Sequence, residues 1–258
     1  MTVPDLAFTD PAGADGAPLL VLGPSLGTST ILWENTLPML RKHYRVTAWD
    51  LPGHGESPKA EAPFTVADLA DAVARGARDL GADRILYAGV SLGGATGLEL
   101  ALRHPDLVAA AAIVASGAQL GDPQAWHDRA KQVREQSTSS LIVGSAQRWF
   151  APGSIEREPE LSGRLLHVLQ DADDESYARC CEALAAFDVQ DRLGEIRPAI
   201  CAIWGRHDQV APEAKAEQIA SGVPHGSIAV IEDAAHLPPA EQPAATASAL
   251  VAFFDAVR

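Results

Sequence analysis

Short runs of apolar residues alternate with longer amphipathic stretches along most of the chain. The first two runs, residues 18–22 and 44–49, each lead into a turn that contains glycine and proline. Residues 65–80 follow with apolar positions at helical spacing, and Thr65 stands where an N-cap is expected. Strands that alternate with helices in this way predict βαβ crossovers and a mainly parallel sheet.

Four more apolar runs continue the pattern. Residues 84–88 are followed by an alanine- and leucine-rich stretch at 95–103, typical of a helix, and the next strand is expected at 108–115. Residues 199–204 and 227–231 complete the series. The fold class is therefore α/β, with a mainly parallel twisted sheet that carries helices on both faces.

The pattern changes between residues 119 and 193. Strand signals fade there, and the segment becomes helical, polar and rich in arginine. A helical insertion between two strands of a parallel sheet predicts a lid over the carboxyl ends of the strands, where open α/β sheets place their sites. We expect a core of residues 1–118 and 194–258, with residues 119–193 as the lid.

Composition restricts the class of protein further. The 258 residues fit one large α/β domain, and 47% of them are hydrophobic. The net charge of −14 argues against nucleic acid as a partner, because phosphates select basic surfaces. It leaves room for a small anionic substrate, since a local arginine can outweigh a diffuse field at short range.

Cellular location is predicted from the chain start, the apolar runs and the cysteines. Residues 1–5 have neither the basic region nor the apolar core of a secretory signal, and no apolar run approaches the roughly 20 residues of a membrane span. Cys180, Cys181 and Cys201 provide no disulfide framework, which fits a reducing compartment. We expect a cytoplasmic protein with no membrane partner, in which the adjacent cysteines pack inside a helix.

The most informative motif is the sequence GVSLGG at residues 89–94, directly after an apolar run. A serine with glycine two positions before and two after lets a strand turn sharply into a helix and expose its hydroxyl. The glycines are required because a Cβ at either position would collide with the neighbouring strand or helix. Ser91 is therefore the candidate nucleophile.

A nucleophilic serine needs a base, and the base needs an orienting carboxylate. The order expected after such an elbow is serine, acid, histidine. Asp208 follows the strand at 199–204 and His236 follows the last strand, so both fall on the same sheet edge as Ser91. Asp50 and Asp233 are rival acids; the first precedes the serine, and the second is too close along the chain to reach behind the imidazole.

Two further histidines have simpler interpretations. His54 lies between two glycines and is expected to brace its loop by a hydrogen bond, and the side chain of His207 is expected to point away from that of Asp208.

The oxyanion of a tetrahedral intermediate needs two backbone donors. One is expected from Leu92. The other should come from the loop after the first strand, where Ser25 and Leu26 are the candidates and Leu26 is favoured because Pro24 has no N–H.

These motifs together resemble the α/β-hydrolase superfamily, and within it the 3-oxoadipate enol-lactonases. The superfamily features are the serine elbow, the turn DLPGHGES at 50–57, and the late Asp208 and His236. The narrower likeness rests on SLGT at 25–28, GVSLGGA at 89–95, the arginine- and tryptophan-rich motifs of the lid, and YARCC at 177–181. The similarity covers nearly the whole chain.

The resemblance implies hydrolysis of 3-oxoadipate enol-lactone to 3-oxoadipate without a cofactor or a metal. The substrate has one carboxylate, so we expect a cation in the pocket, with Arg129 and Arg134 of the lid as candidates and Trp126 and Trp149 as apolar walls. Alternatives on the same scaffold are a broad carboxylesterase, a cofactor-free perhydrolase, and a ligand receptor that keeps the triad with negligible turnover. A homo-oligomer is compatible with the sequence.

Overall fold

A seven-stranded sheet forms the centre of the computed structural model, which describes residues 3–257. The strand order is β1-β3-β2-β4-β5-β6-β7, and every neighbouring pair is parallel except β1 with β3. The strands are β1 (Ala12–Gly13), β2 (Leu19–Gly23), β3 (Arg45–Ala48), β4 (Ile85–Val90), β5 (Val108–Val114), β6 (Ala199–Gly205) and β7 (Gly226–Ile231). The prediction of a mainly parallel α/β sheet is confirmed.

Six of these strands lie within two residues of the apolar runs that predicted them. Their signal was strong because both faces of the central strands are covered: every residue of β2 and of β4 is buried. The strand β1 was not predicted; its two residues pair antiparallel with β3 at the edge of the sheet. So short a strand contains no periodicity to detect.

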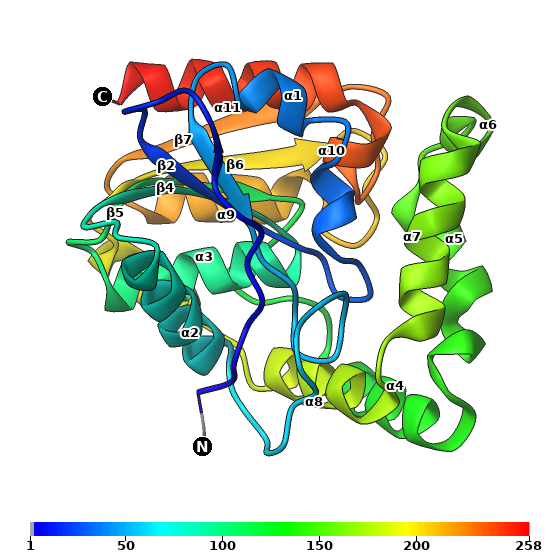
Figure 1. Cartoon of the computed structure of the whole chain (residues 1–258). Coiled ribbons are helices and arrows are strands. Elements are labelled where there is room, and N and C mark those ends of the chain that lie inside the picture. Colours follow the sequence, from blue (N-terminus) through cyan, green and yellow to red (C-terminus); the bar gives the residue numbers. More distant parts are fainter. Residues whose placement is uncertain (1–2, 258) are drawn as a thin grey trace.

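Helices pack on both faces of the sheet, as predicted (Figure 1). On one face lie α2 (Val66–Asp79) and α3 (Leu92–Arg103), which pack on each other, together with α9 (Glu213–Gly222). On the other lie α1 (Leu37–Leu40) and α11 (Pro243–Ala256), preceded by the short α10 (Pro238–Glu241). Thr65 is the N-cap of α2, and it forms a reciprocal capping box with Asp68.

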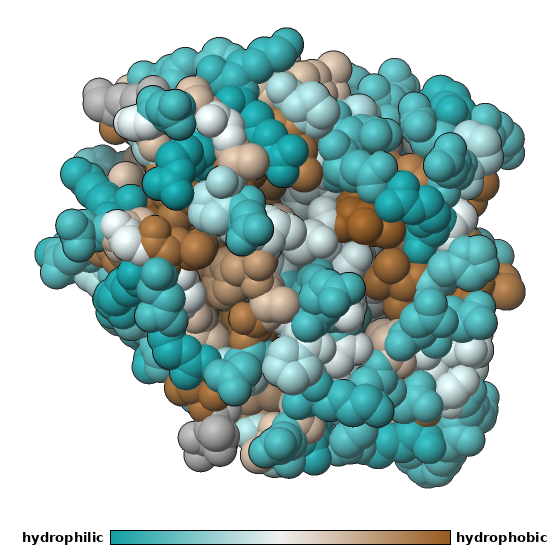
Figure 2. All heavy atoms as spheres, in the orientation of Figure 1, coloured by the Kyte–Doolittle hydropathy of each residue, from teal (hydrophilic) through white to brown (hydrophobic). Residues whose placement is uncertain are grey.

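Five α-helices lie between β5 and β6, all inside the stretch 119–193, and we call them the cap. They are α4 (Pro123–Gln136), α5 (Ile142–Trp149), α6 (Ser154–Arg157), α7 (Pro159–Asp171) and α8 (Asp174–Ala185). The helices α4 and α8 pack closely on each other, and α5 packs on α7 (Figure 1). Figure 2 shows that hydrophilic residues dominate the outer surface on this side.

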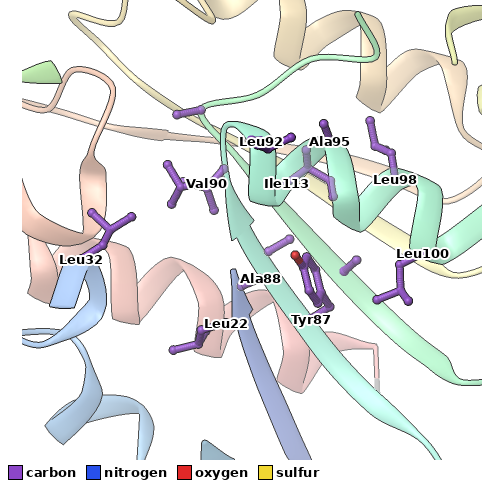
Figure 3. Packing of buried hydrophobic residues seen from close by; sticks show 14 of the residues in the cluster. Leu22, Leu32, Tyr87, Ala88, Val90, Leu92, Ala95, Leu98, Leu100 and Ile113 are labelled. Atoms are coloured by element: carbon purple, nitrogen blue, oxygen red, sulfur yellow. The ribbon is translucent and has the colours of Figure 1, made fainter. Parts of the chain in front are cut away.

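The junction of β4 with α3 is packed with buried apolar side chains (Figure 3). The ring of Tyr87 lies against the first turns of α3, and its hydroxyl donates a hydrogen bond of 2.7 Å to the carbonyl oxygen of Gly93. This packing gives the following turn a rigid base. Cys180 and Cys181 are buried in α8, and their thiols are free.

Residues 3–257 contain neither a membrane-spanning helix nor a cluster of metal-ligating side chains. None of the helices in that range is long and apolar enough to cross a membrane. Nor does the range bring together three or more histidine, cysteine, aspartate or glutamate side chains in a group that could hold a metal ion.

Candidate active site

Ser91 occupies a strained turn between β4 and α3. Its φ angle is 54°, in the left-handed region that side chains with a Cβ rarely adopt. The flanking glycines permit this turn: a Cβ on Gly89 would lie 2.3 Å from the carbonyl oxygen of Gly93, and one on Gly93 would lie 2.6 Å from that of Pro24. Ser116 Oγ fixes the turn further by donating a 2.7 Å hydrogen bond to the carbonyl oxygen of Ser91.

Asp208 and His236 form a buried pair. Asp208 Oδ2 lies 2.9 Å from His236 Nδ1, and both residues are at most 5% exposed. Asp208 Oδ1 accepts hydrogen bonds from the N–H groups of Val210 (2.7 Å) and Ala211 (3.1 Å). Burial opposes ionisation of Asp208, but the attraction of His236 and these hydrogen bonds hold its pKa below the ordinary value. Asp208 is therefore suited to hold the Nδ1–H tautomer of His236.

The loop after β2 presents one free backbone donor. The N–H of Ser25 donates to Thr28 Oγ1 at 3.0 Å, and that of Gly27 donates to His54 Nε2 at 3.3 Å. Between them, the N–H of Leu26 has no acceptor within residues 3–257. Leu92 is the first residue of α3, where helix N–H groups lack intrahelical acceptors. Of the two donors the sequence left open in this loop, the structure therefore favours Leu26.

Pro24 joins this loop to the serine turn. Its carbonyl oxygen accepts a 3.0 Å hydrogen bond from the N–H of Gly93, in the first turn of α3. The donor that proline lacks is therefore not needed at this contact, and its carbonyl group links the loop to the elbow.

His54 holds the loop after β2 in place through a hydrogen bond. Its Nδ1 lies 2.9 Å from the carbonyl oxygen of Pro52, which can only accept, so Nδ1 carries the proton and Nε2 accepts from Gly27. The ring stacks on Tyr177, with centroids 5.9 Å apart. Burial lowers the pKa of His54 from its ordinary 6.5 to about 4, so the neutral ring persists through the neutral pH range.

This buried neutral histidine predicts an acid-dependent loss of stability. The unfolded chain protonates His54 near pH 6.5, whereas the folded protein resists protonation until about pH 4. The contribution of His54 to the free energy of unfolding is complete above pH 6.5. As the pH falls from 6.5 to 4, this contribution decreases by about 3 kcal/mol. In His54→Gln, urea unfolding at pH 7.5 and pH 4.5 should show a difference smaller than that of the wild type by about 2 kcal/mol.

The exposed His43 provides the control for this measurement. His43→Gln should keep the wild-type difference between the two pH values, because its side chain meets water in both states. Equal acid sensitivity of the wild type and His54→Gln would show that His54 does not resist protonation in the folded protein.

A cavity of about 170 Å³ lies between the core and the cap. The core contributes Ser25, Leu26, Ser91, Val210 and His236 to its wall, and the cap contributes Trp126, Arg129, Ser145, Arg148, Trp149 and Tyr177. The structure thus brings Ser91 and His236 together with three of the four cap residues expected to contact substrate. Leu92 contributes its buried backbone at the end of the serine turn.

Two guanidinium groups face this cavity without carboxylate partners. Arg129 lies over the ring of Trp126, 4.9 Å from its centroid, and Arg148 is half-buried on α5. Neither forms an ion pair with any residue in the range 3–257. Burial, followed by repulsion from Arg129, lowers the pKa of Arg148, although a guanidinium stays charged. These two guanidinium groups outnumber the one carboxylate that residues 3–257 place in the cavity wall, that of Asp122, although the protein as a whole is acidic.

Arg134, the other predicted carboxylate-binding arginine, lies elsewhere. Its guanidinium forms ion pairs with Glu175, at 2.7 Å, and with Glu182, both on α8. It takes no part in the cavity wall. Arg148 lines the cavity instead. The sequence did not predict this, although Arg148 directly precedes Trp149, which was predicted to be an apolar wall.

The comparisons with known proteins agree with this architecture. A family model described as the alpha/beta hydrolase fold matches residues 18–243, and the chain belongs to that family. A 3-oxoadipate enol-lactonase of Acinetobacter baylyi is 34% identical to this chain. The match covers 90% of this chain and 87% of the enol-lactonase. The crystal structure of the enol-lactonase from Burkholderia xenovorans matches with a TM-score of 0.93 and 31% identity, covering 97% of this chain and 96% of that one.

A second group of relatives has a different assigned activity. RutD of Serratia proteamaculans is assigned to carbamate hydrolysis and is 30% identical to this chain. The match covers 85% of this chain and 84% of RutD. The enol-lactonase of Acinetobacter baylyi is therefore more similar to this chain than that RutD is, both in identity and in coverage.

Proposed function

We propose that the protein is a serine hydrolase that opens 3-oxoadipate enol-lactone to 3-oxoadipate. The observation that carries this proposal is one cavity lined by Ser91, by His236 with Asp208 bound to its Nδ1, and by two arginines that form no ion pair within residues 3–257. The first three residues supply the chemistry of acyl transfer, and the arginines match the carboxylate that the lactone bears. The likeness to enol-lactonases supports the same substrate.

The reaction follows from the roles of these groups. His236 Nε2 takes the proton of Ser91 Oγ, which attacks the lactone carbonyl carbon, and Asp208 holds the imidazolium that forms. The N–H groups of Leu26 and Leu92 stabilise the oxyanion. When the tetrahedral intermediate collapses, the ring C–O bond breaks and the enol oxygen receives the proton from His236. Water activated by His236 then hydrolyses the acyl-enzyme and frees Ser91.

Ring opening is driven forward by the leaving group. The released enol becomes a ketone, which cannot re-attack the acyl-enzyme as an alcohol would. The acyl chain stays bound through Ser91 until water reaches the carbonyl carbon, so the carboxylate that the arginines hold anchors the same molecule through both steps.

The two cavity arginines should determine affinity for the anionic substrate. In Arg129→Ala or Arg148→Ala, we expect KM for the enol-lactone to rise about 10- to 100-fold, because a charged hydrogen bond to the carboxylate is lost. KM for phenyl acetate, which carries no charge, should change less than about threefold. Steady-state kinetics with both substrates measures the difference.

Arg134→Ala is the matched control. Arg134 comes from the same cap helix as Arg129, and Glu175 and Glu182 neutralise its charge outside the cavity. We expect both KM values to stay at the wild-type level in this variant. A rise in KM for the lactone that is equal in all three variants, or equal for both substrates, would contradict recognition of the carboxylate by Arg129 and Arg148.

Hydrolysis of a carbamate is the second candidate, and the similarity to RutD favours it. The same triad and oxyanion donors would serve, because a carbamate also passes through a tetrahedral intermediate. The two candidates are separated by the relative kcat/KM values for an enol-lactone and a carbamate that bear the same carboxylate.

A further inference from the structure

Glu241 is a buried carboxylate that the proposed chemistry does not use. It is the last residue of α10, five positions after His236, and it is only 5% exposed. It has no ion-pair partner within residues 3–257. Figure 1 shows α10 on the side of the core that faces the cap helices α5 and α7. An isolated charge at such a site needs several hydrogen bonds to offset its lost hydration.

One oxygen of this carboxylate holds the histidine loop. Oε1 of Glu241 accepts hydrogen bonds from the N–H of Ala235, at 2.8 Å, and from that of Leu237, at 3.2 Å. These two residues flank His236 in the chain. The backbone on both sides of the imidazole is therefore anchored to a single group.

The other oxygen holds the cap. Oε2 of Glu241 accepts from the N–H of Ala151, at 2.6 Å, and from Ser154 Oγ, at 2.8 Å. Arg157 donates to the same Ser154 oxygen at 2.9 Å, which leaves the Ser154 proton directed at Glu241. Ala151 follows closely on Arg148 and Trp149, both of which line the cavity.

A direct contact completes the unit. The N–H of His236 donates a 3.1 Å hydrogen bond to the carbonyl oxygen of Trp149. Residues 149–154 of the cap and residues 235–237 of the core are thus one hydrogen-bonded assembly with Glu241 at its centre. Burial raises the pKa of Glu241, while its four donors favour the charged form.

We infer that Glu241 is a positioning residue, which sets the imidazole of His236 against the cap wall that carries Arg148 and Trp149. This inference rests on the proposed function, because it assigns His236 as the base. Without the carboxylate, the four donors lose their shared acceptor, and the histidine loop and the cap move independently. A displacement of about 1 Å at the base would cost about 100-fold in rate.

The test uses Glu241→Gln, which keeps the volume of the side chain but turns an amide NH2 toward one pair of donors. We expect kcat for phenyl acetate to fall about 30- to 100-fold. The rate of Ser91 labelling by a fluorophosphonate should fall in parallel. In proton NMR spectra, the downfield resonance of His236 Nδ1–H should shift or broaden, since it reports the hydrogen bond to Asp208.

Ser154→Ala removes only one cap contact and leaves the two donors beside His236 in place. In this variant, KM for the enol-lactone should rise about threefold to tenfold, while kcat stays within about twofold. It also keeps the inference testable if Glu241→Gln does not fold. Unchanged kinetics in Ser154→Ala would then contradict the coupling of the cap to the cavity.

Phe254→Leu controls for lost stability alone. Phe254 is fully buried in α11, where it packs on Tyr44. If Glu241→Gln lowers the melting temperature as Phe254→Leu does, and leaves kcat, labelling rate and the Nδ1–H resonance unchanged, Glu241 is only structural and the inference fails. If the wild type itself neither labels nor hydrolyses phenyl acetate, the proposed function fails instead.

Discussion

Replacing Ser91 with alanine is expected to lower kcat for the enol-lactone by about 10⁴- to 10⁶-fold. Alanine removes the attacking oxygen and keeps the Cβ, so the strained turn at a φ of 54° is retained. The melting temperature should therefore match that of the wild type. Labelling by a fluorophosphonate should disappear, as mass spectrometry of the intact protein would show.

Ser145 is the matched serine for this experiment. It lies in the same cavity wall, is 2% exposed, and comes from the cap helix α5. Ser145→Ala should lower kcat less than about tenfold and keep full labelling at Ser91. Residual lactone turnover in Ser91→Ala within about tenfold of the wild type would mean that Ser91 is not the nucleophile.

Asp208→Asn is expected to lower kcat by about 10³- to 10⁴-fold with little change in KM. The N–H groups of Val210 and Ala211 will retain an oxygen at the Oδ1 position. The new NH2 group then faces His236 Nδ1 and donates to it. This contact forces the proton of the imidazole onto Nε2. A protonated Nε2 can no longer accept the proton of Ser91.

Asp233→Asn separates this effect from a general loss of acidic charge. Asp233 is exposed and adopts a φ of 55°, which asparagine also tolerates. This variant should keep wild-type kcat and KM. If Asp233→Asn loses activity and Asp208→Asn does not, the acid of the triad has been misassigned.

Local chain chemistry explains why much of this architecture could be predicted. The glycines around Ser91 are needed by the turn itself, so they mark it in the sequence. Asp208 and His236 follow parallel strands directly, and carboxyl ends of parallel strands share one sheet edge. Each of these inferences needed only a motif and the strand that precedes it.

The cap was less predictable because its contacts depend on which face of each helix points inward. Trp126 and Arg129 are three residues apart and share a face of α4. Arg134 comes five residues after Arg129, which rotates it by about 140° around the helix and toward α8. That rotation could have been used to separate the two arginines. No comparable signal placed Arg148 in the cavity wall.

The contacts of Glu241 could not be predicted from the sequence at all. Its partners in the cap, Ala151 and Ser154, are 90 and 87 positions away along the chain. Neither spacing nor composition relates segments so far apart, because tertiary packing alone brings them together. The same is true of His54, which was expected to brace its own loop and also accepts a hydrogen bond from Gly27 in the loop beside Ser91.

Hydrolysis of the enol-lactone by the wild-type protein is the decisive measurement of the proposed function. Freshly generated 3-oxoadipate enol-lactone, followed by its loss of ultraviolet absorbance, should be consumed with a kcat/KM of at least about 10⁴ M⁻¹ s⁻¹. This value should exceed those for phenyl acetate and for a carboxylate-bearing carbamate by about 100-fold. A higher kcat/KM for either of those substrates than for the lactone would contradict the proposed function.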